Sequence, residues 1–191
     1  MPFAYYRRLS AAHKAIYRKS DGISRIEVPN LDAMRGLSLR IEQALIAAKR
    51  SDVEAAANDF AQALFDAFSV RRVRVYVRAT RPSSDQSELH GLYTFADGDA
   101  PPKIEVWMRT AAHKQVVRFR TFLRTLAHEM LHHLDVTHFE LGESFHTEGF
   151  YRRESSLMRQ LLPERIMGAA KAKASAPPAK RRKKPSQLSL F

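Results

Sequence analysis

The residues best suited to chemistry form the pattern His-Glu-x-x-His, at His128, Glu129 and His132. On an α-helix, side chains four positions apart lie on one face, so the two imidazoles would point toward one place. Two nitrogen ligands at this spacing suit a zinc ion. Glu129 lies about 100° around such a helix from His128, where its carboxylate can accept a proton from bound water. The pattern therefore predicts a Zn²⁺ site with Glu129 beside it.

The segment that carries this pattern predicts a buried helix. Apolar residues recur at helical spacing over residues 115–134, namely Val116, Phe119, Phe122, Leu123, Leu126, Met130 and Leu134. Burying His128 and Glu129 there is costly unless a metal or another partner satisfies them, which argues against a chance coincidence on a core helix. Asp135, one turn after His132, is interpreted as an exposed polar residue near the helix end, with orientation of a ligand imidazole as the alternative.

A zinc site that keeps one position for water needs a third protein ligand. The downstream candidates are His133, His138, Glu140, Glu143, His146, Glu148 and Glu154. His133 points about 100° away from its neighbour His132, so we expect it outside the ligand set. His138 has the spacing of metzincins without their glycine. His146 follows Ser144, a predicted N-cap of a helix to about residue 162, and a ligand at such a helix start can return to the site.

Two further helices are expected before the metal-binding segment. They cover residues 33–49 and 51–68, with Asp32 and Ser51 as their N-caps. A basic, aromatic-rich helix that ends near Gly22 precedes them. Its cations and aromatic side chains suit contact with nucleic acid, and packing of the same aromatics onto the body is the alternative.

A small sheet is expected between these helices and the metal-binding helix. From residue 72 the sequence period changes to two, with Val73, Val75 and Val77 alternating against Arg72, Arg74, Tyr76 and Arg78. This alternation predicts a strand with one buried face and one cationic face. Two more strands are expected over residues 89–95 and 103–108. The order of elements predicts an α+β fold in which an extended substrate can add itself to the sheet edge beside the metal.

Length and composition indicate one domain with a basic tail. The chain has 191 residues, of which 45% are hydrophobic, enough for a domain of roughly 160 residues with its own core. We expect a basic N-terminal segment over residues 1–30, a domain over 31–164 and a disordered tail over 165–191. No apolar run reaches the ~18 residues of a membrane span, and no apolar signal segment follows the N-terminus, so a cytoplasmic protein is expected. The absence of cysteine excludes a cysteine-ligated zinc site and fits that compartment.

The positive charge is concentrated in the tail. Residues 165–191 hold eight Lys and Arg and no acid, which leaves +4 of the net charge of +12 for residues 1–164. This distribution favours a polyanionic partner, and nucleic acid is the one we expect. A tail that only aids solubility is the alternative.

The pattern His-Glu-x-x-His, followed by His146 and an aromatic four residues later at Phe150, resembles SprT-like (Spartan-type) zinc metalloproteases. The resemblance covers roughly residues 30–162 and implies a zincin-like fold. It implies that His128, His132 and His146 bind Zn²⁺ and that Glu129 is the general base. Thr147 replaces the glycine that customarily follows the third histidine, and no zinc-ribbon cysteines follow, so His138 and a gluzincin-like Glu154 stay open as third ligands.

The last residues of the chain suggest a docking peptide. An apolar cluster at the end of a cationic tether has the reach and the side chains that such a peptide needs. Gln187, Leu188, Leu190 and Phe191 match the informative positions of the Gln-Leu-x-Leu-Phe peptide by which bacterial proteins bind the β sliding clamp, and the sequence resembles that peptide. Folding of these residues back onto the domain is the alternative.

Together these resemblances imply a bacterial, nucleoid-associated zinc metalloendopeptidase that the sliding clamp recruits to DNA, where it cleaves crosslinked or bound proteins. The tail also holds a basic cluster that would add salt-sensitive contacts to phosphates, namely Lys180, Arg181, Arg182, Lys183 and Lys184. Two alternatives come from other classes of protein. One is a zinc peptidase whose tail is incidental, and the other is a non-catalytic adaptor for DNA or the clamp in which the metal is structural.

Overall fold

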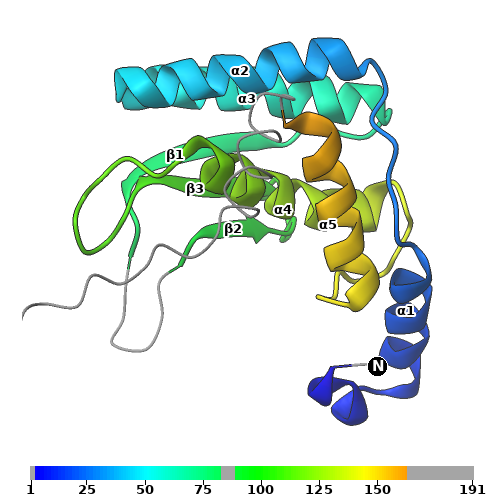
Figure 1. Ribbon diagram of the computed structural model, residues 1–191. Coiled ribbons are helices and arrows are strands. Elements are labelled where there is room, and N and C mark those ends of the chain that lie inside the picture. Colours follow the sequence, from blue (N-terminus) through cyan, green and yellow to red (C-terminus); the bar gives the residue numbers. More distant parts are fainter. Residues whose placement is uncertain (1–2, 83–88, 163–191) are drawn as a thin grey trace, which may run out of the picture.

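The computed structural model describes residues 3–82 and 89–162 (Figure 1). Its helices are η1 (Ala4–Arg8), a 3-10 helix, and α1 (Ala11–Gly22), α2 (Leu31–Ala47), α3 (Arg50–Ala67), α4 (Phe119–Thr137) and α5 (Glu148–Leu161); its strands are β1 (Arg74–Thr80), β2 (Gly91–Thr94) and β3 (Lys103–Arg109). This content confirms the predicted α+β class. The basic cluster at residues 180–184 and the terminal peptide at 187–191 lie outside the described residues.

The three strands form one mixed sheet in the order β1-β3-β2. β1 pairs with β3 in parallel, and β2 pairs with β3 in the antiparallel direction. Alternate residues of β1 and β3 are buried, among them Val75, Val77, Ile104 and Val106, as the period of two predicts. α4 packs against β2 and β3, while α3 lies along β1 with α2 stacked on it (Figure 1).

The free edge of β1 is closed by side chains of α3. The Asn58 amide accepts from the Val75 N–H at 3.0 Å and donates to the Val75 carbonyl at 2.7 Å. Glu54 accepts from the Val77 N–H at 2.9 Å, and Arg50 donates to the Val77 carbonyl at 3.0 Å. These bonds replace those of a neighbouring strand, so β1 has no open edge at these residues.

The starts of three helices differ from the predicted ones by one to a few residues. α2 begins at Leu31 after Asn30, whose left-handed φ of 51° turns the chain, so Asp32 lies in the first turn instead of at the cap. α3 likewise begins one residue before Ser51. α5 begins at Glu148, because the Thr147 hydroxyl accepts from a backbone N–H in the first turn and acts as the N-cap that was assigned to Ser144.

The start of α4 is set by the sheet. The Val117 N–H donates to the Met108 carbonyl at 2.8 Å, and Val116 forms a bridge with Arg109. These two valines therefore continue the sheet, and the helix begins at Phe119 instead of residue 115. Their side chains still join the core, as the apolar spacing indicated.

The helix expected in the N-terminal segment ends at Gly22 as predicted but begins only at Ala11, and the segment packs onto the body. Ser10 caps α1 by accepting from a backbone N–H, and the chain before it forms the short η1. Tyr17 is buried at 1% exposure, so at this residue the packing alternative is correct. α1 ends against the start of α5 at Gly149, where an added Cβ would lie 2.4 Å from the Ser20 carbonyl oxygen.

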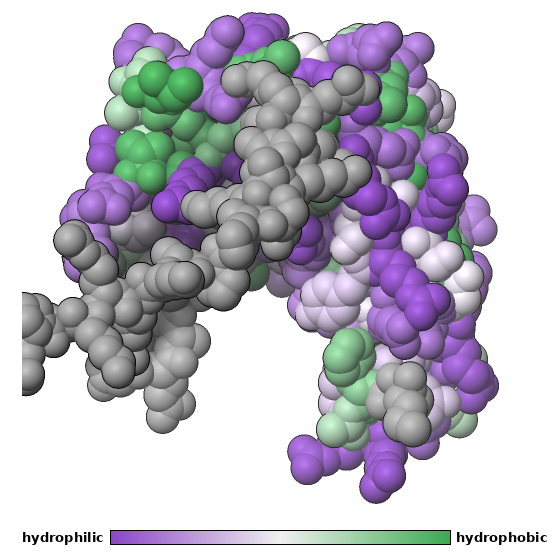
Figure 2. Space-filling view, viewed as in Figure 1, coloured by the Kyte–Doolittle hydropathy of each residue, from purple (hydrophilic) through white to green (hydrophobic). Residues whose placement is uncertain are grey.

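Hydrophilic side chains cover most of the visible face, particularly along α1 and α5 (Figure 2). None of the helices within residues 3–82 and 89–162 is both long and apolar enough to cross a membrane.

Candidate metal centre

Three histidines from two parts of the chain meet at one point. α4 presents His128 and His132 on one face, and His146 comes from the loop before α5. One ring nitrogen of each lies within 4.8 Å of the other two, and the Nε2 atoms of His128 and His146 are 2.9 Å apart. This group can hold a metal ion, and its members are the three histidines that the sequence analysis named as ligands.

Hydrogen bonds on the far side of the rings fix their orientation. His128 Nδ1 lies 3.0 Å from a carboxylate oxygen of Glu154, and His132 Nδ1 lies 2.7 Å from the Ser144 hydroxyl. Because an ionised carboxylate only accepts, the first bond places a proton on Nδ1 of His128 and leaves its Nε2 lone pair for a ligand. This is the arrangement that metal-bound imidazoles ordinarily have.

The alternative third ligands take other positions. Glu154 lies behind His128, where Arg124 also pairs with it at 2.9 Å, so its carboxylate holds the ring of a candidate ligand. The His138 ring packs on Phe68 at 4.9 Å between centroids, outside the group. His133 is 2% exposed and bonds to the Tyr93 hydroxyl and a backbone carbonyl, in agreement with its predicted exclusion from the ligand set.

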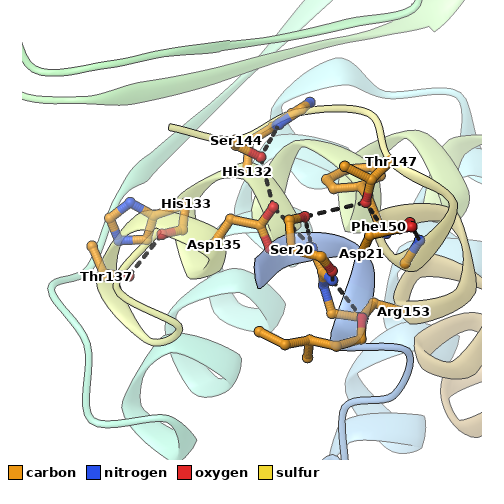
Figure 3. Close-up of polar contacts among 12 residues, drawn as sticks. Ser20, Asp21, His132, His133, Asp135, Thr137, Ser144, Thr147, Phe150 and Arg153 are labelled. Carbon is orange, nitrogen blue, oxygen red and sulfur yellow. Dashed lines mark hydrogen bonds and ion pairs between the residues drawn. The ribbon is translucent and has the colours of Figure 1, made fainter. Parts of the chain in front are cut away.

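The expectation that Asp135 is an exposed polar residue is wrong. Asp135 is 0% exposed and forms an ion pair with Arg153, at 2.8 Å and 3.0 Å from the two carboxylate oxygens (Figure 3). It also accepts from the Ser144 hydroxyl at 2.8 Å, and that hydroxyl bonds to His132. The chain of contacts therefore runs from Arg153 to the ring of a candidate ligand, which is the alternative role considered for Asp135.

This ion pair also joins three helices. Arg153, on α5, donates to the carbonyls of Ser20 and Ile23 at the end of α1 as well as to Asp135 on α4. Burial raises the pKa of Asp135, and the Arg153 guanidinium opposes that rise. Two charges without exposure to solvent are tolerated only when their hydrogen bonds are made, as most are here.

Glu129 follows His128 on α4 and is 7% exposed. Its carboxylate accepts from the backbone N–H of Tyr93 on β2. Burial raises its pKa to about 7, although the nearby His128 and this N–H bond act in the opposite direction. A pKa near the working pH is what a general base requires. Burial also lowers the pKa of His132 to about 3, so its imidazole stays neutral, as a metal ligand must be.

The approach of β2 to Glu129 depends on Gly91. A Cβ added at Gly91 would lie 2.4 Å from Glu129 Oε1 and 2.7 Å from a side-chain carbon of Thr125. Contacts this short cannot form without displacement of the strand or the carboxylate. The sequence analysis missed this role, for which the only signal is a glycine inside a strand, a common mark of close approach.

A cleft of about 480 Å³ opens beside the site, between the start of β2, α4 and α5. Its lining residues are Leu89, His90, Gly91, Arg124, Thr125, His128, Glu129, Tyr151 and Glu154. A larger cleft of about 570 Å³ between α3 and β1 holds no member of the histidine group. We therefore assign the smaller cleft to the candidate site, because it contains His128 and Glu129.

Comparison with protein-family models, with curated proteins and with solved structures found no match to this chain. The geometry of the three histidines and Glu129 is therefore the ground for a functional proposal.

Proposed function

We propose that this protein is a zinc-dependent endopeptidase of the SprT-like type, with a zincin-like arrangement of helix and sheet. The convergence of three imidazoles beside a buried carboxylate carries the proposal. His128, His132 and His146 would hold the ion, which supplies a Lewis acid for the scissile carbonyl and for water. Glu129 accepts the proton of the attacking water and delivers it to the leaving amine.

The free edge of β2 supports a polypeptide as the substrate. Among the described residues β2 pairs only with β3, and its Tyr93 N–H lies against Glu129. An extended peptide that pairs with this edge is brought beside the carboxylate. Leu89, at the start of the cleft, and Tyr151, on its α5 side, are 41% and 43% exposed and offer apolar contact to substrate side chains.

Recruitment to DNA is the second part of the proposal. It relies on the sequence of the tail, in which the basic cluster at residues 180–184 would contact phosphates and the peptide at 187–191 would bind the β sliding clamp. The substrates would then be proteins crosslinked or bound to DNA in the bacterial cytoplasm. Loss of clamp binding after deletion of residues 187–191, with unchanged peptidase activity, tests this part separately.

The decisive experiment on the site is Glu129→Gln. The variant keeps its shape and the three histidines, so metal content measured by mass spectrometry should be unchanged. Cleavage of an unfolded protein substrate should fall by about 10²–10⁴-fold, because the general base is lost. Glu143→Gln is the matched control, since its side chain is 50% exposed and lies outside the histidine group.

A zinc-loaded Glu129→Gln protein that cleaves at the rate of the unmodified protein contradicts the assignment of the base. An unmodified protein that holds zinc and cleaves nothing favours instead the adaptor with a structural metal.

A further inference from the structure

The sheet has a second face that the proposed peptidase does not use. The residues of β1 and β3 that point away from the core are Arg74, Tyr76, Arg78, Lys103, Glu105, Trp107 and Arg109. We call this set the outer face. Its members are neighbours across the two strands, because Arg74 pairs with Lys103, Tyr76 with Glu105 and Arg78 with Trp107. Four cations and one acid give the outer face a net charge of +3.

The outer face is accessible in the described part of the chain. The residues between its members, such as Val77 and Val106, are buried toward the helices, and the helices that contact the sheet most are α3 and α4. Arg74 and Arg78 are exposed, and Trp107 is half-buried. The face is therefore presented on the side of the sheet opposite to α4.

The charged and aromatic side chains on this face are held in place. The guanidinium carbons of Arg74 and Arg78 lie 5.2 Å and 5.5 Å from the centre of the Tyr76 ring. Glu105 pairs with Arg78 at 2.6 Å and with Lys103 at 2.9 Å. The single acid thus anchors two cations, which lowers the entropy that they lose when they bind a ligand.

We propose that the outer face binds single-stranded nucleic acid, with bases stacked on Trp107 and Tyr76 and phosphates bound by the surrounding cations. Regular alternation of aromatic rings and cations on an open surface is the combination that single strands recognise. The bases of a duplex are stacked on one another and cannot stack on Trp107 or Tyr76. A duplex could therefore contact this surface only through its phosphates. The chain's own residues 165–191 carry eight cations and no acid, so charge disfavours them as the occupant.

This proposal is independent of the metal site and is tested in the full-length protein. Trp107 is the only tryptophan of the chain, so its fluorescence reports on the outer face and not on the basic tail. Titration with oligothymidine should quench this emission in a saturable manner. Labelled oligothymidine, followed by anisotropy in the same titration, reports total binding.

Charge and stacking variants sharpen the test. The double variant Arg74→Gln, Arg78→Gln should weaken quenching-detected binding by about 10-fold or more and reduce the slope of log affinity against log salt by about 1.4. Tyr76→Leu should weaken it by about 10-fold and leave that slope unchanged. The matched control, Arg25→Gln with Arg40→Gln, removes two exposed charges that lie outside β1 and β3 and should leave the affinity detected by quenching unchanged. Circular dichroism and thermal unfolding establish that each variant is folded.

Three results would overturn the proposal. The first is saturation of the anisotropy signal without any change in Trp107 emission, which places the nucleic acid elsewhere. The second is equal quenching by inorganic polyphosphate, which indicates an anion site without base stacking. The third is displacement of oligothymidine by poly-glutamate at equal charge, which indicates that the outer face prefers an acidic polypeptide.

Discussion

Ser144 is the residue through which the buried Asp135 carboxylate reaches a candidate ligand, because its hydroxyl contacts both Asp135 and His132. Ser144→Ala removes the partner of His132 Nδ1 and frees the ring to rotate. We expect zinc affinity, measured by competition with a chromogenic chelator, to fall by about 10–100-fold. Ser144→Thr retains the hydroxyl and should restore most of the affinity. Equal affinity in all three proteins would show that the hydroxyl does not position the ring.

Gly91 sets the distance between the edge strand and the carboxylate. Gly91→Ala places a methyl group where Glu129 Oε1 now lies, so the carboxylate must move. Cleavage should fall by about 100-fold, since a shift of about 1 Å in a reacting group has that effect, while metal content stays the same. Gly36→Ala is the control, because nothing lies within 4 Å of its added Cβ. A Gly91→Ala protein with full activity would show that the carboxylate tolerates the shift.

At the scale of single residues, spacing along a helix predicted His128, Glu129 and His132, since that geometry is local. His146 was identified by resemblance, and the structure brings it to the other two. The burial of Asp135 was not predictable in the same way. Its partner Arg153 lies 18 residues further along the chain, and no periodic signal connects the two residues.

At the scale of elements, the apolar periods predicted the main helices and the strands, while local contacts such as the Thr147 cap of α5 and the sheet bonds before α4 set where the helices begin. The hydrogen bonds of Asn58 are an example of a contact that apolar periodicity does not predict. It lies on α3 and serves the sheet, bonding both backbone groups of Val75. Such bonds form only after the helix and the strand have packed together. β1 pairs with β3 although β2 lies between them in the sequence. This strand order is likewise a property of the assembled sheet.

Asn58→Ala leaves the N–H and carbonyl of Val75 without these partners. We expect the free energy of unfolding to fall by about 1–3 kcal/mol, measured by urea denaturation. Asp59→Ala, one position along the same helix, is the control, because its side chain is 48% exposed and pairs only with an exposed arginine. An equal loss of unfolding free energy in Asn58→Ala and Asp59→Ala would mean that the bonds from Asn58 to Val75 do not stabilise the fold.

At the scale of the whole molecule, Arg153 connects α1, α4 and α5. Arg153→Met leaves the Asp135 charge buried without its partner, so stability should fall by about 3–5 kcal/mol. Adding Asp135→Asn removes that charge and keeps an acceptor for Ser144, so the double variant should be more stable than Arg153→Met alone. Urea denaturation of Arg153→Met, of Asp135→Asn and of the double variant gives a double-mutant cycle for this ion pair. Strict additivity would argue against coupling between the two side chains.

Composition predicted one domain with its own core, and one core cluster takes in residues of α2, α3, β1, β3, α4 and α5. Composition does not predict that the N-terminal segment contacts the loop that carries His146. The Tyr5 hydroxyl donates to the His146 carbonyl at 2.8 Å, across 141 positions of sequence. Contacts of that separation depend on the complete packing of the chain and leave no mark on local patterns.

The closure of β1 by α3 limits how copies of this protein can associate. Within residues 3–82 and 89–162, β2 is the strand whose edge stays open for backbone pairing between two copies, and each copy then presents the β1 side of its sheet outward. A third copy finds the backbone groups of Val75 and Val77 already bonded to side chains of α3. The closed edge at these two residues therefore opposes growth of a continuous fibre through this sheet beyond a pair, even when the protein is crowded.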